Sequence, residues 1–251
     1  MTAERPAARG DEPPAVEERR RLRRLRALIV DERTRRRLIV LLGVATFVLV
    51  SLLAVVVRAT QVLALDLFAS HEFQEIPGGW FRSLMLAISS LGYTPLAEIV
   101  VGAGALLVGI LLGWREGAYL LVVTVAQGLV NMAVKTAVGR PRPLDSLIQV
   151  LVPQQGNSFP SGHVMFYTVF FGFLGFLALA RLPRSPWRAA LVAVCAVLIA
   201  LIGPSRIYIG AHWRSDVIAA YLIGVTLLAL AIEGYLAYLA PRSLPATVKH
   251  T

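Results

Sequence analysis

Three short polar segments of this sequence combine cations, hydroxyl groups and histidines in patterns that could perform chemistry: residues 135–143, 158–163 and 205–216. In the third segment, His212 and Asp216 are four residues apart, so on a helix they share one face and can meet. A carboxylate on one imidazole nitrogen fixes the tautomer and leaves the other nitrogen free to act as a nucleophile. Arg206 adds a guanidinium suited to bidentate contact with a phosphate. On its own, this segment also fits a purely structural His–Asp pair.

The second segment, Ser-Phe-Pro-Ser-Gly-His, predicts the start of a helix. Pro160 and Ser161 are typical first residues of helices, and the free backbone N–H groups at such a start bind anions. Gly162 lets a ligand approach the backbone closely, and His163 lies in the first turn beside any anion bound there. In isolation, the same residues also describe an ordinary helix cap followed by an interfacial histidine.

The first segment supplies cations, with Lys135 at the end of an apolar stretch and Arg142 seven residues later. They could hold an oxyanion, or they could be basic residues that snorkel from a helix end. Arg140 repeats the Arg-Pro step of Arg142 and is a further candidate for substrate binding.

Together, the segments favour one reaction class, because cations can neutralise phosphoryl oxygens in place of Mg²⁺ and two histidines can move protons. The sequence offers no second carboxylate pair for a glycosidase, no cluster of metal-ligand spacing and no glycine-rich phosphate loop before a helix. We therefore expect phosphoryl transfer without a metal ion or another cofactor.

The elements that position these segments are expected to lie in a membrane. Of the 251 residues, 57% are apolar and 16% are charged, whereas ordinary globular domains have about 45–50% and about 25%. The mean hydropathy is +0.67. A bilayer is therefore the expected solvent, and disordered, collagen-like and disulfide-rich classes are excluded. The one cysteine, Cys195, cannot form an internal disulfide.

Six apolar stretches approach the roughly 20 residues that a helix needs to cross a bilayer core of about 30 Å. They are Leu38–Val57, a span within Leu84–Trp114, Ala118–Val134, His163–Ala180, Ala189–Gly203 and Val217–Ala240. With the N-terminus inside, the inner face holds 18 of the 25 Lys and Arg residues, as cytoplasmic loops prefer. We predict an all-α bundle of six transmembrane helices, with both termini cytoplasmic and all three polar segments at the outer face.

The N-terminal residues 1–37 differ from the rest, because they hold 12 of the 25 Lys and Arg residues and 7 of the 15 acidic ones. They predict a cytoplasmic tail that is disordered or lies on anionic lipid as an amphipathic helix, where each basic residue adds about 1 kcal/mol. Nucleic-acid binding is disfavoured, since few aromatic residues accompany the basic ones. The expected division is the tail 1–37, a membrane domain 38–240 and a cytoplasmic C-terminal tail 241–251.

Four further positions receive structural interpretations. Gln127 and Asn131 are predicted to form interhelical hydrogen bonds inside the membrane. Glu233, near the inner end of the last span, is predicted to be paired or to snorkel. An interfacial aromatic belt is predicted from three side chains: Trp80, Phe81 and Trp213.

The three polar segments, in this order, resemble the motifs of the type 2 phosphatidic acid phosphatase (PAP2) superfamily. These motifs are Lys, six residues, Arg-Pro; then Pro-Ser-Gly-His; then Ser-Arg, five residues, His, three residues, Asp. All eleven fixed positions match: Lys135, Arg142, Pro143, Pro160, Ser161, Gly162, His163, Ser205, Arg206, His212 and Asp216. The resemblance covers the membrane domain and leaves the N-terminal tail uncovered.

The resemblance implies a role for each matched side chain. His212 would attack phosphorus to form a phosphohistidine, Asp216 would orient it, and His163 would protonate the leaving oxygen and then deprotonate water. The phosphate would be held by the remaining polar positions: Lys135, Arg142, Ser161, Gly162 and Arg206. Attack needs a neutral His212 and a protonated His163, which neighbouring anions are expected to keep charged. We therefore predict a bell-shaped rate profile with its optimum between about pH 5 and 8.

A site at the outer membrane boundary needs a substrate whose phosphate reaches it while the tail stays in lipid. The resembled family includes phosphatases of undecaprenyl diphosphate, phosphatidylglycerophosphate and phosphatidic acid. The layout looks bacterial, which makes undecaprenyl diphosphate the first choice, in a plasma membrane with the site facing the periplasm.

Other functions stay open at this point. A phosphotransferase would pass the phosphoryl group to another alcohol, and nothing in the motifs separates it from a hydrolase. A binder without turnover is disfavoured by the intact catalytic positions. A transporter is disfavoured because the polar groups gather at one face rather than at the midplane. The oligomeric state is left open.

Overall fold

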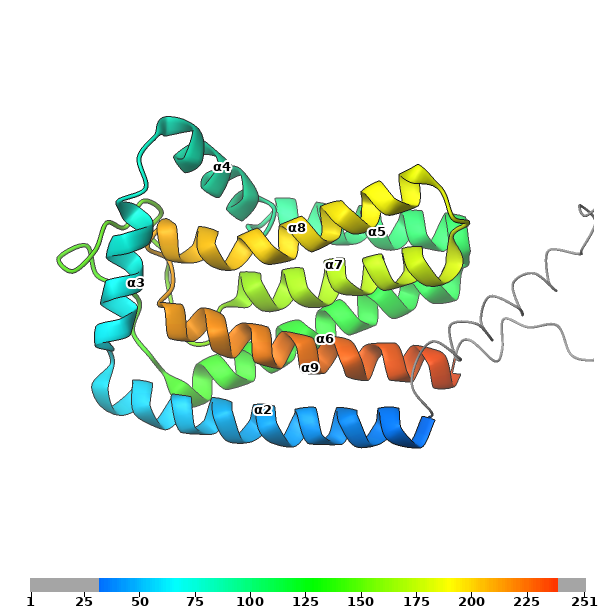
Figure 1. The fold of residues 1–251 in the computed structure, drawn as a ribbon, viewed down its shortest axis with the longest axis horizontal. Coiled ribbons are helices and arrows are strands. Elements are labelled where there is room, and N and C mark those ends of the chain that lie inside the picture. Colours follow the sequence, from blue (N-terminus) through cyan, green and yellow to red (C-terminus); the bar gives the residue numbers. More distant parts are fainter. Residues whose placement is uncertain (1–31, 239–251) are drawn as a thin grey trace, which may run out of the picture.

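The computed structural model describes residues 32–238 and contains helices but no strand within that range (Figure 1). The eight helices in chain order are α2 (Glu32–Thr60), α3 (Ala64–Gln74), α4 (Gly79–Ser90), α5 (Leu96–Leu112), α6 (Trp114–Val138), α7 (Gly162–Arg181), α8 (Pro186–Tyr208) and α9 (Arg214–Tyr238). The predicted C-terminal tail 241–251 and residues 1–31 of the predicted N-terminal tail lie outside the described residues.

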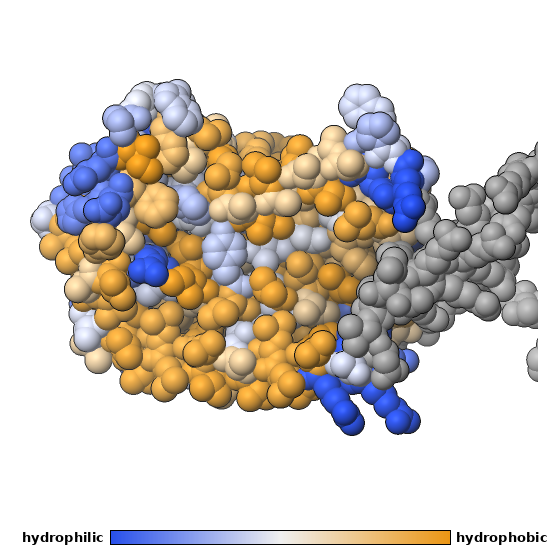
Figure 2. Space-filling view, viewed as in Figure 1, coloured by the Kyte–Doolittle hydropathy of each residue, from blue (hydrophilic) through white to orange (hydrophobic). Residues whose placement is uncertain are grey.

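Six long helices lie side by side, and two short ones sit at one end of the bundle (Figure 1). Helices α3 and α4 lie at that end, whereas α2 begins and α9 ends at the other. Figure 2 shows apolar side chains covering the middle of the visible face, with hydrophilic ones towards the two ends. This distribution is typical of a protein whose middle is surrounded by lipid.

Five helices are long and apolar enough to cross a membrane: α2, α6, α7, α8 and α9. Helix α5 is apolar but shorter, with 17 residues, which corresponds to about 25 Å of helix. The span expected within Leu84–Trp114 is thus divided between α4 and α5, with a turn at residues 91–95. The protein is an integral, multi-pass membrane protein.

Helix α7 is the centre of the bundle and packs against α6, α8 and α9. Thirteen of its 20 residues are buried. Helix α2 is mostly exposed on the outside of the bundle, because only 11% of its most apolar 18-residue segment is buried. It is attached to α9 by a hydrogen bond between the Thr46 and Thr226 hydroxyls (2.9 Å) and by an ion pair between Arg35 Nε and Glu233 Oε2 (2.5 Å). The prediction that Glu233 is paired is therefore confirmed.

Glycines end the helices where the chain must turn towards the site. Gly139 has a left-handed conformation (φ +67°) directly after α6, and its N–H donates to the Lys135 carbonyl, so the helix stops one turn after Lys135. Gly210 has φ +69° between α8 and α9, and an added Cβ there would lie 3.0 Å from the Val150 Cα. A side chain at Gly210 is therefore excluded both by the backbone conformation and by the neighbouring loop.

Candidate active site

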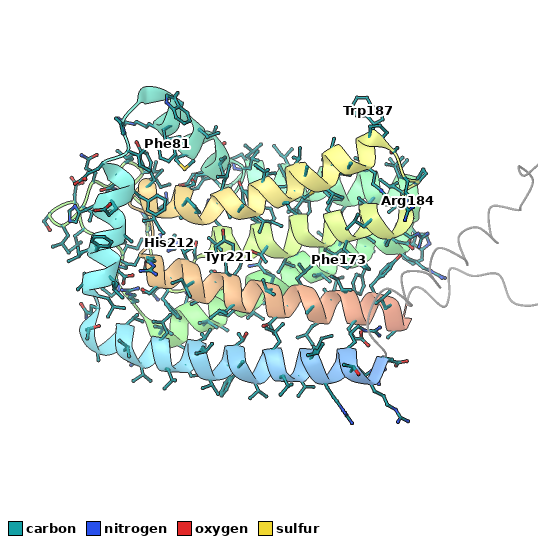
Figure 3. All side chains as sticks on the ribbon, viewed as in Figure 1. Phe81, Phe173, Arg184, Trp187, His212 and Tyr221 are labelled. Carbon is teal, nitrogen blue, oxygen red and sulfur yellow. The ribbon has the colours of Figure 1, made fainter. Side chains whose placement is uncertain are left out.

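His212 lies in the short turn between α8 and α9, at the end of the bundle that carries α3 (Figure 3). Asp216 is in the first turn of α9, and its Oδ2 lies 3.5 Å from the His212 Nδ1. The two residues meet as expected, but not on one helix face, because His212 precedes the helix. Both side chains are buried.

A third side chain, Ser158, joins this pair. Its hydroxyl donates to Asp216 Oδ2 and lies 3.4 Å from His212 Nδ1. The same carboxylate oxygen accepts from the Trp213 backbone N–H at 2.9 Å. Ser158 lies within the second polar segment, but sequence reasoning assigned it no role, since its contacts are 54 and 58 residues away in the chain.

Arg140 supports Asp216 from the other side. Its Nη1 lies 2.6 Å from Asp216 Oδ1, and its Nη2 lies 2.6 Å from Oδ2 of Asp66 in α3. Asp66 also accepts from the Ser215 backbone N–H (2.8 Å) and hydroxyl (2.8 Å), so it holds the first turn of α9. The expectation that Arg140 binds substrate is therefore wrong in this structure, because the Arg140 side chain is buried and occupied by two carboxylates.

Two further cations lie against the loop that leads to α7. Lys135 Nζ donates to the backbone carbonyls of Asn157 (2.7 Å) and Ser158 (3.2 Å). Arg142 Nη1 donates to the Ala211 carbonyl at 2.8 Å and lies 3.4 Å from Nε2 of His212. The nitrogen of His212 that faces away from Asp216 therefore faces a guanidinium.

Arg206 is buried near the end of α8 and is held from the α4 side. Its Nη1 donates to the Ser89 hydroxyl (2.6 Å) and to the Tyr93 hydroxyl (2.5 Å). Its Nε is buried without a hydrogen-bond partner. Neither Ser89 nor Tyr93 was singled out from the sequence, because neither belongs to a chemical motif.

Four buried side-chain polar atoms have no partner among the described residues: Trp213 Nε1 and three atoms of the predicted site, Ser161 Oγ, His163 Nε2 and Arg206 Nε. The three site atoms come from the N-cap of α7, its first turn and the end of α8. Buried polar groups in native proteins are normally satisfied, so this group of unsatisfied atoms fits a bound polar ligand. Two of the three are hydrogen-bond donors from residues that the sequence analysis placed around a phosphate.

The charged side chains that act on His163 in the described structure are Arg206, Arg142 and Lys135. The expectation that neighbouring anions keep His163 charged stays a prediction, because these neighbouring side chains are cations. A bound phosphate is the anion that would sit among these cations and favour a protonated His163.

Burial lowers the pKa of His212 well below its usual value of 6.5, and the positive charges of Arg206, Lys135 and Arg142 lower it further. A neutral imidazole with a free ring nitrogen is the form needed for nucleophilic attack. Burial and the neighbouring Arg206 also lower the pKa of Arg142 to about 10, which leaves this guanidinium protonated at neutral pH.

Two residues with predicted structural roles lie next to the site, and one of them differs from its prediction. Trp213 is buried and lies 5.7 Å from the Arg140 guanidinium carbon, so it is part of the support for the site and not of an interfacial belt. Asn131 bonds across to the Pro160 carbonyl (3.4 Å) and to Met165 Sδ (3.2 Å), as an interhelical residue should. Asn131 also packs against Gly162, because a Cβ added at Gly162 would lie 3.0 Å from Asn131 Oδ1.

A metal site is not apparent in the described part of the chain, since no group of three or more His, Cys, Asp or Glu residues could hold an ion there. The site is instead defined by cations, hydroxyls and two imidazoles at one end of a membrane bundle. These features define an integral-membrane enzyme that acts on phosphate esters.

Comparisons with known proteins specify this class. Residues 116–238 match the family model described as PAP2 superfamily. Phosphatidylglycerophosphatase B of Bacillus subtilis (strain 168) is 27% identical over 194 residues, which are 76% of this chain and 93% of that protein. Lipid A 1-phosphatase of Rhizobium etli is 36% identical over 141 residues, which are 51% of this chain and 56% of that protein.

Solved structures agree. A transmembrane PAP2 type phosphatidylglycerolphosphate phosphatase from Bacillus subtilis superimposes with a TM-score of 0.65 at 26% identity, over 78% of this chain and 96% of that one. Aquifex aeolicus LpxE shares the fold, with a TM-score of 0.54 at 20% identity, over 68% and 96% of the two chains. About half of the chain, residues 116–238, thus matches the PAP2 superfamily, and the two Bacillus subtilis matches that align with about three quarters of it are named as phosphatases.

Proposed function

We propose that this protein removes phosphate from a membrane lipid through a phosphohistidine on His212. One observation carries the proposal: His212 is buried with Nδ1 towards Asp216, among three buried polar atoms that lack partners, on Ser161, His163 and Arg206. Such preorganised donors, placed where phosphoryl charge develops, stabilise the transition state of phosphoryl transfer.

The reaction has two steps. In the first, His212 Nε2 attacks phosphorus, the bond to the leaving oxygen breaks, and His163 donates its proton to that oxygen. Asp216 stabilises the positive charge that develops on the phosphorylated ring. In the second, water gives a proton to His163 and attacks phosphorus, the P–N bond breaks, and His212 returns to its neutral form with release of inorganic phosphate.

The phosphoryl oxygens would be held throughout by five residues: Lys135, Arg142, Ser161, Gly162 and Arg206. Three of these are cations, and the backbone N–H groups at the start of α7 add a helix N-terminus, which favours anions. This arrangement supports charge neutralisation by the protein itself. We therefore propose a reaction that needs no metal ion.

For the lipid, undecaprenyl diphosphate is the first candidate from the motif resemblance. The Bacillus relative's name adds phosphatidylglycerophosphate, and the Rhizobium relative's name adds lipid A 1-phosphate. All of these present a phosphate at the membrane surface and keep their hydrocarbon in the bilayer. We propose that the site faces the periplasm of a bacterial plasma membrane, with both chain termini in the cytoplasm.

The test is phosphate release by purified protein in detergent with excess chelator. The substrates are undecaprenyl diphosphate, phosphatidylglycerophosphate, phosphatidic acid and lipid A 1-phosphate. We expect release that is lost in His212→Ala and kept in His71→Ala, a matched control because His71 is exposed on α3. The lipid with the highest kcat/KM identifies the substrate class. Release that survives in His212→Ala, or that requires a metal, would contradict the proposal.

A phosphotransferase would use the same phosphohistidine with an alcohol in place of water. Adding increasing concentrations of a short alcohol to the assay separates the two functions. A hydrolase releases inorganic phosphate as its main product without the alcohol, whereas a transferase produces little phosphate until its acceptor is present.

A further inference from the structure

Tyr93 contacts two functional residues of the site at once, although it lies outside all three motifs and outside the residues that match the family model. It belongs to the turn between α4 and α5 (Figure 1). Its hydroxyl accepts from Arg206 Nη1 at 2.5 Å. Its ring meets the His163 ring edge to face, with centroids 4.6 Å apart and an angle of 69° between the planes.

The hydroxyl contact determines which edge of the Arg206 guanidinium is available. Tyr93 and Ser89 both accept from Nη1, and they come from the α4 side of the bundle. The guanidinium is planar, so fixing Nη1 fixes the directions of the other N–H groups. Nε is the atom left buried without a partner. Tyr93 and Ser89 thus occupy the Nη1 group of the guanidinium, and the Nε–H group is left for a phosphate oxygen.

The ring contact determines where the His163 imidazole lies. An added Cβ at Gly92 would lie 2.8 Å from Nε2 of His163, so the turn packs directly on the imidazole. The adjacent Tyr93 ring covers another part of it in the edge-to-face arrangement that aromatic pairs favour. Gly92 and Tyr93 together leave His163 little freedom to rotate, and its Nε2 is buried without a partner.

We infer that Tyr93 is a positioning residue with two separable parts, the hydroxyl aiming Arg206 at the phosphate and the ring aiming His163 at the leaving oxygen. This inference rests on the proposed function, because it assumes the roles of Arg206 and His163 given above. It makes the turn between α4 and α5 a fourth segment of the site, beside the three motif segments.

The two parts can be tested with two substitutions. Tyr93→Phe keeps the ring and removes the acceptor, so we expect the inhibition constant of inorganic phosphate and the KM of the lipid to rise about tenfold, the loss typical of a hydrogen bond to a charged group. The rate of proton donation should change little. Tyr93→Leu also removes the ring, so proton donation should suffer in addition.

Proton donation is measured with two phosphate esters that the parent protein hydrolyses, one aryl and one alkyl. An aryl oxygen is a good leaving group and needs little protonation, whereas an alkyl oxygen depends on the general acid. We expect Tyr93→Leu to lower kcat/KM for the alkyl ester about tenfold more than for the aryl ester, which is a part of the roughly 10²–10⁴-fold that a general acid typically contributes. Tyr93→Phe should lower both equally.

The matched control is Tyr119→Phe, which removes another partly buried tyrosine hydroxyl, one that donates to the Ala231 carbonyl between α6 and α9. It should leave the inhibition constant of phosphate and the aryl-to-alkyl ratio at their parental values. A phosphate inhibition constant that is the same in Tyr93→Phe and the parent would overturn the inference for the hydroxyl. An unchanged aryl-to-alkyl ratio in Tyr93→Leu would overturn it for the ring.

These outcomes are distinguishable from failure of the proposed function. If the parent protein releases no phosphate, or His212→Ala still releases it, the proposed function fails. If the parent is active through His212 and the Tyr93 variants behave like the parent, only the role of Tyr93 is refuted.

Discussion

Arg140 Nη1 lies 2.6 Å from Asp216 Oδ1, and both side chains are fully buried. The same guanidinium contacts Asp66 in α3, so one cation pairs with two carboxylates. The carboxylate beside His212 is therefore anchored to α3 through Arg140, which lies 74 residues after Asp66 in the chain. The support for the proposed nucleophile is spread over α3, α9 and the loop after α6.

This arrangement predicts that Arg140→Met is strongly destabilising. It leaves two buried carboxylates without their cation, and removing one partner of a buried ion pair costs about 3–5 kcal/mol. Asp66→Asn should cost less, because it keeps the side-chain shape and removes one negative charge. Thermal unfolding in detergent measures both, and kcat should fall with them because Asp216 loses its anchor.

The control is Arg214→Met, since Arg214 lies beside Ser215 but is exposed. It should change the free energy of unfolding by less than about 0.5 kcal/mol, as ordinary surface substitutions do. Equal stability of the Arg140 and Arg214 variants would show that the buried pairs contribute nothing.

The second prediction concerns Ser158, whose hydroxyl donates to Asp216 beside Nδ1 of His212. Ser158→Ala removes this contact and frees both groups to shift. We expect kcat to fall about tenfold with little change in KM, which is the size of a lost hydrogen bond to a charged group. Asp216→Asn should be far more damaging, on the order of 10³–10⁴ in kcat, because it abolishes the carboxylate that sets the tautomer.

Steady-state kinetics of the two variants beside Ser90→Ala make the comparison. The Ser90 hydroxyl donates within its own helix, to the Ala87 carbonyl, so its loss should leave kcat unchanged. A Ser158→Ala enzyme with parental kcat would show that Asp216 orients His212 unaided.

The third prediction concerns pH. Burial and the cations Arg206, Lys135 and Arg142 lower the pKa of His212, so the imidazole stays neutral as pH falls through 6.5. The loss of activity that comes from protonating His212 should therefore occur well below pH 6.5. Within the predicted bell-shaped profile, Lys135→Met should move this acid limb to higher pH, because one of the positive charges that lower the pKa is removed. The limb is measured as kcat/KM against pH, which reports the pKa values of the free enzyme.

The same shift has a consequence for stability. In the unfolded chain, this imidazole takes up its proton near its ordinary pKa of about 6.5, whereas the folded protein keeps it neutral. The unfolded state binds more protons below that pH, so the contribution of His212 to stability is present above pH 6.5 and is lost as pH falls. Thermal unfolding of the parent and His212→Gln across this range should show a steeper acid loss for the parent.

The fourth prediction concerns membrane orientation. With both termini inside and the site outside, a reporter that is active only in the cytoplasm should work when fused after residue 251. Cells whose outer membrane has been removed, but whose plasma membrane is intact, should hydrolyse a water-soluble phosphate ester that does not cross membranes. Cells that express His212→Ala provide the background rate. Hydrolysis that appears only after the plasma membrane is broken would contradict this orientation.

Local sequence was sufficient to predict the helical membrane class and the polar segments that come together at one end of the bundle. A long apolar stretch indicates a lipid environment wherever it lies in the fold. For example, α7 begins within one residue of the predicted start of its span. The pairing of His212 with Asp216 followed from a separation of four residues, which keeps two side chains close in a turn as well as on a helix. The cations of the motifs also lie beside His212, as the motif pattern indicated.

The residues that hold this site in place were decided by the tertiary structure. Asp66 lies in a stretch whose sequence shows only that it is polar, yet α3 brings it into contact with Arg140, 74 residues away in the chain. Tyr93 likewise contacts Arg206, 113 residues away. Arg140 looked like a ligand for phosphate, because the sequence shows its charge and not the two carboxylates that occupy it. Spacing along a helix encodes contacts over a few residues, whereas contacts between distant segments depend on how the helices pack. The sequence therefore determined which chemical groups the proposed site contains, and only the packing of the bundle determined what holds them in place.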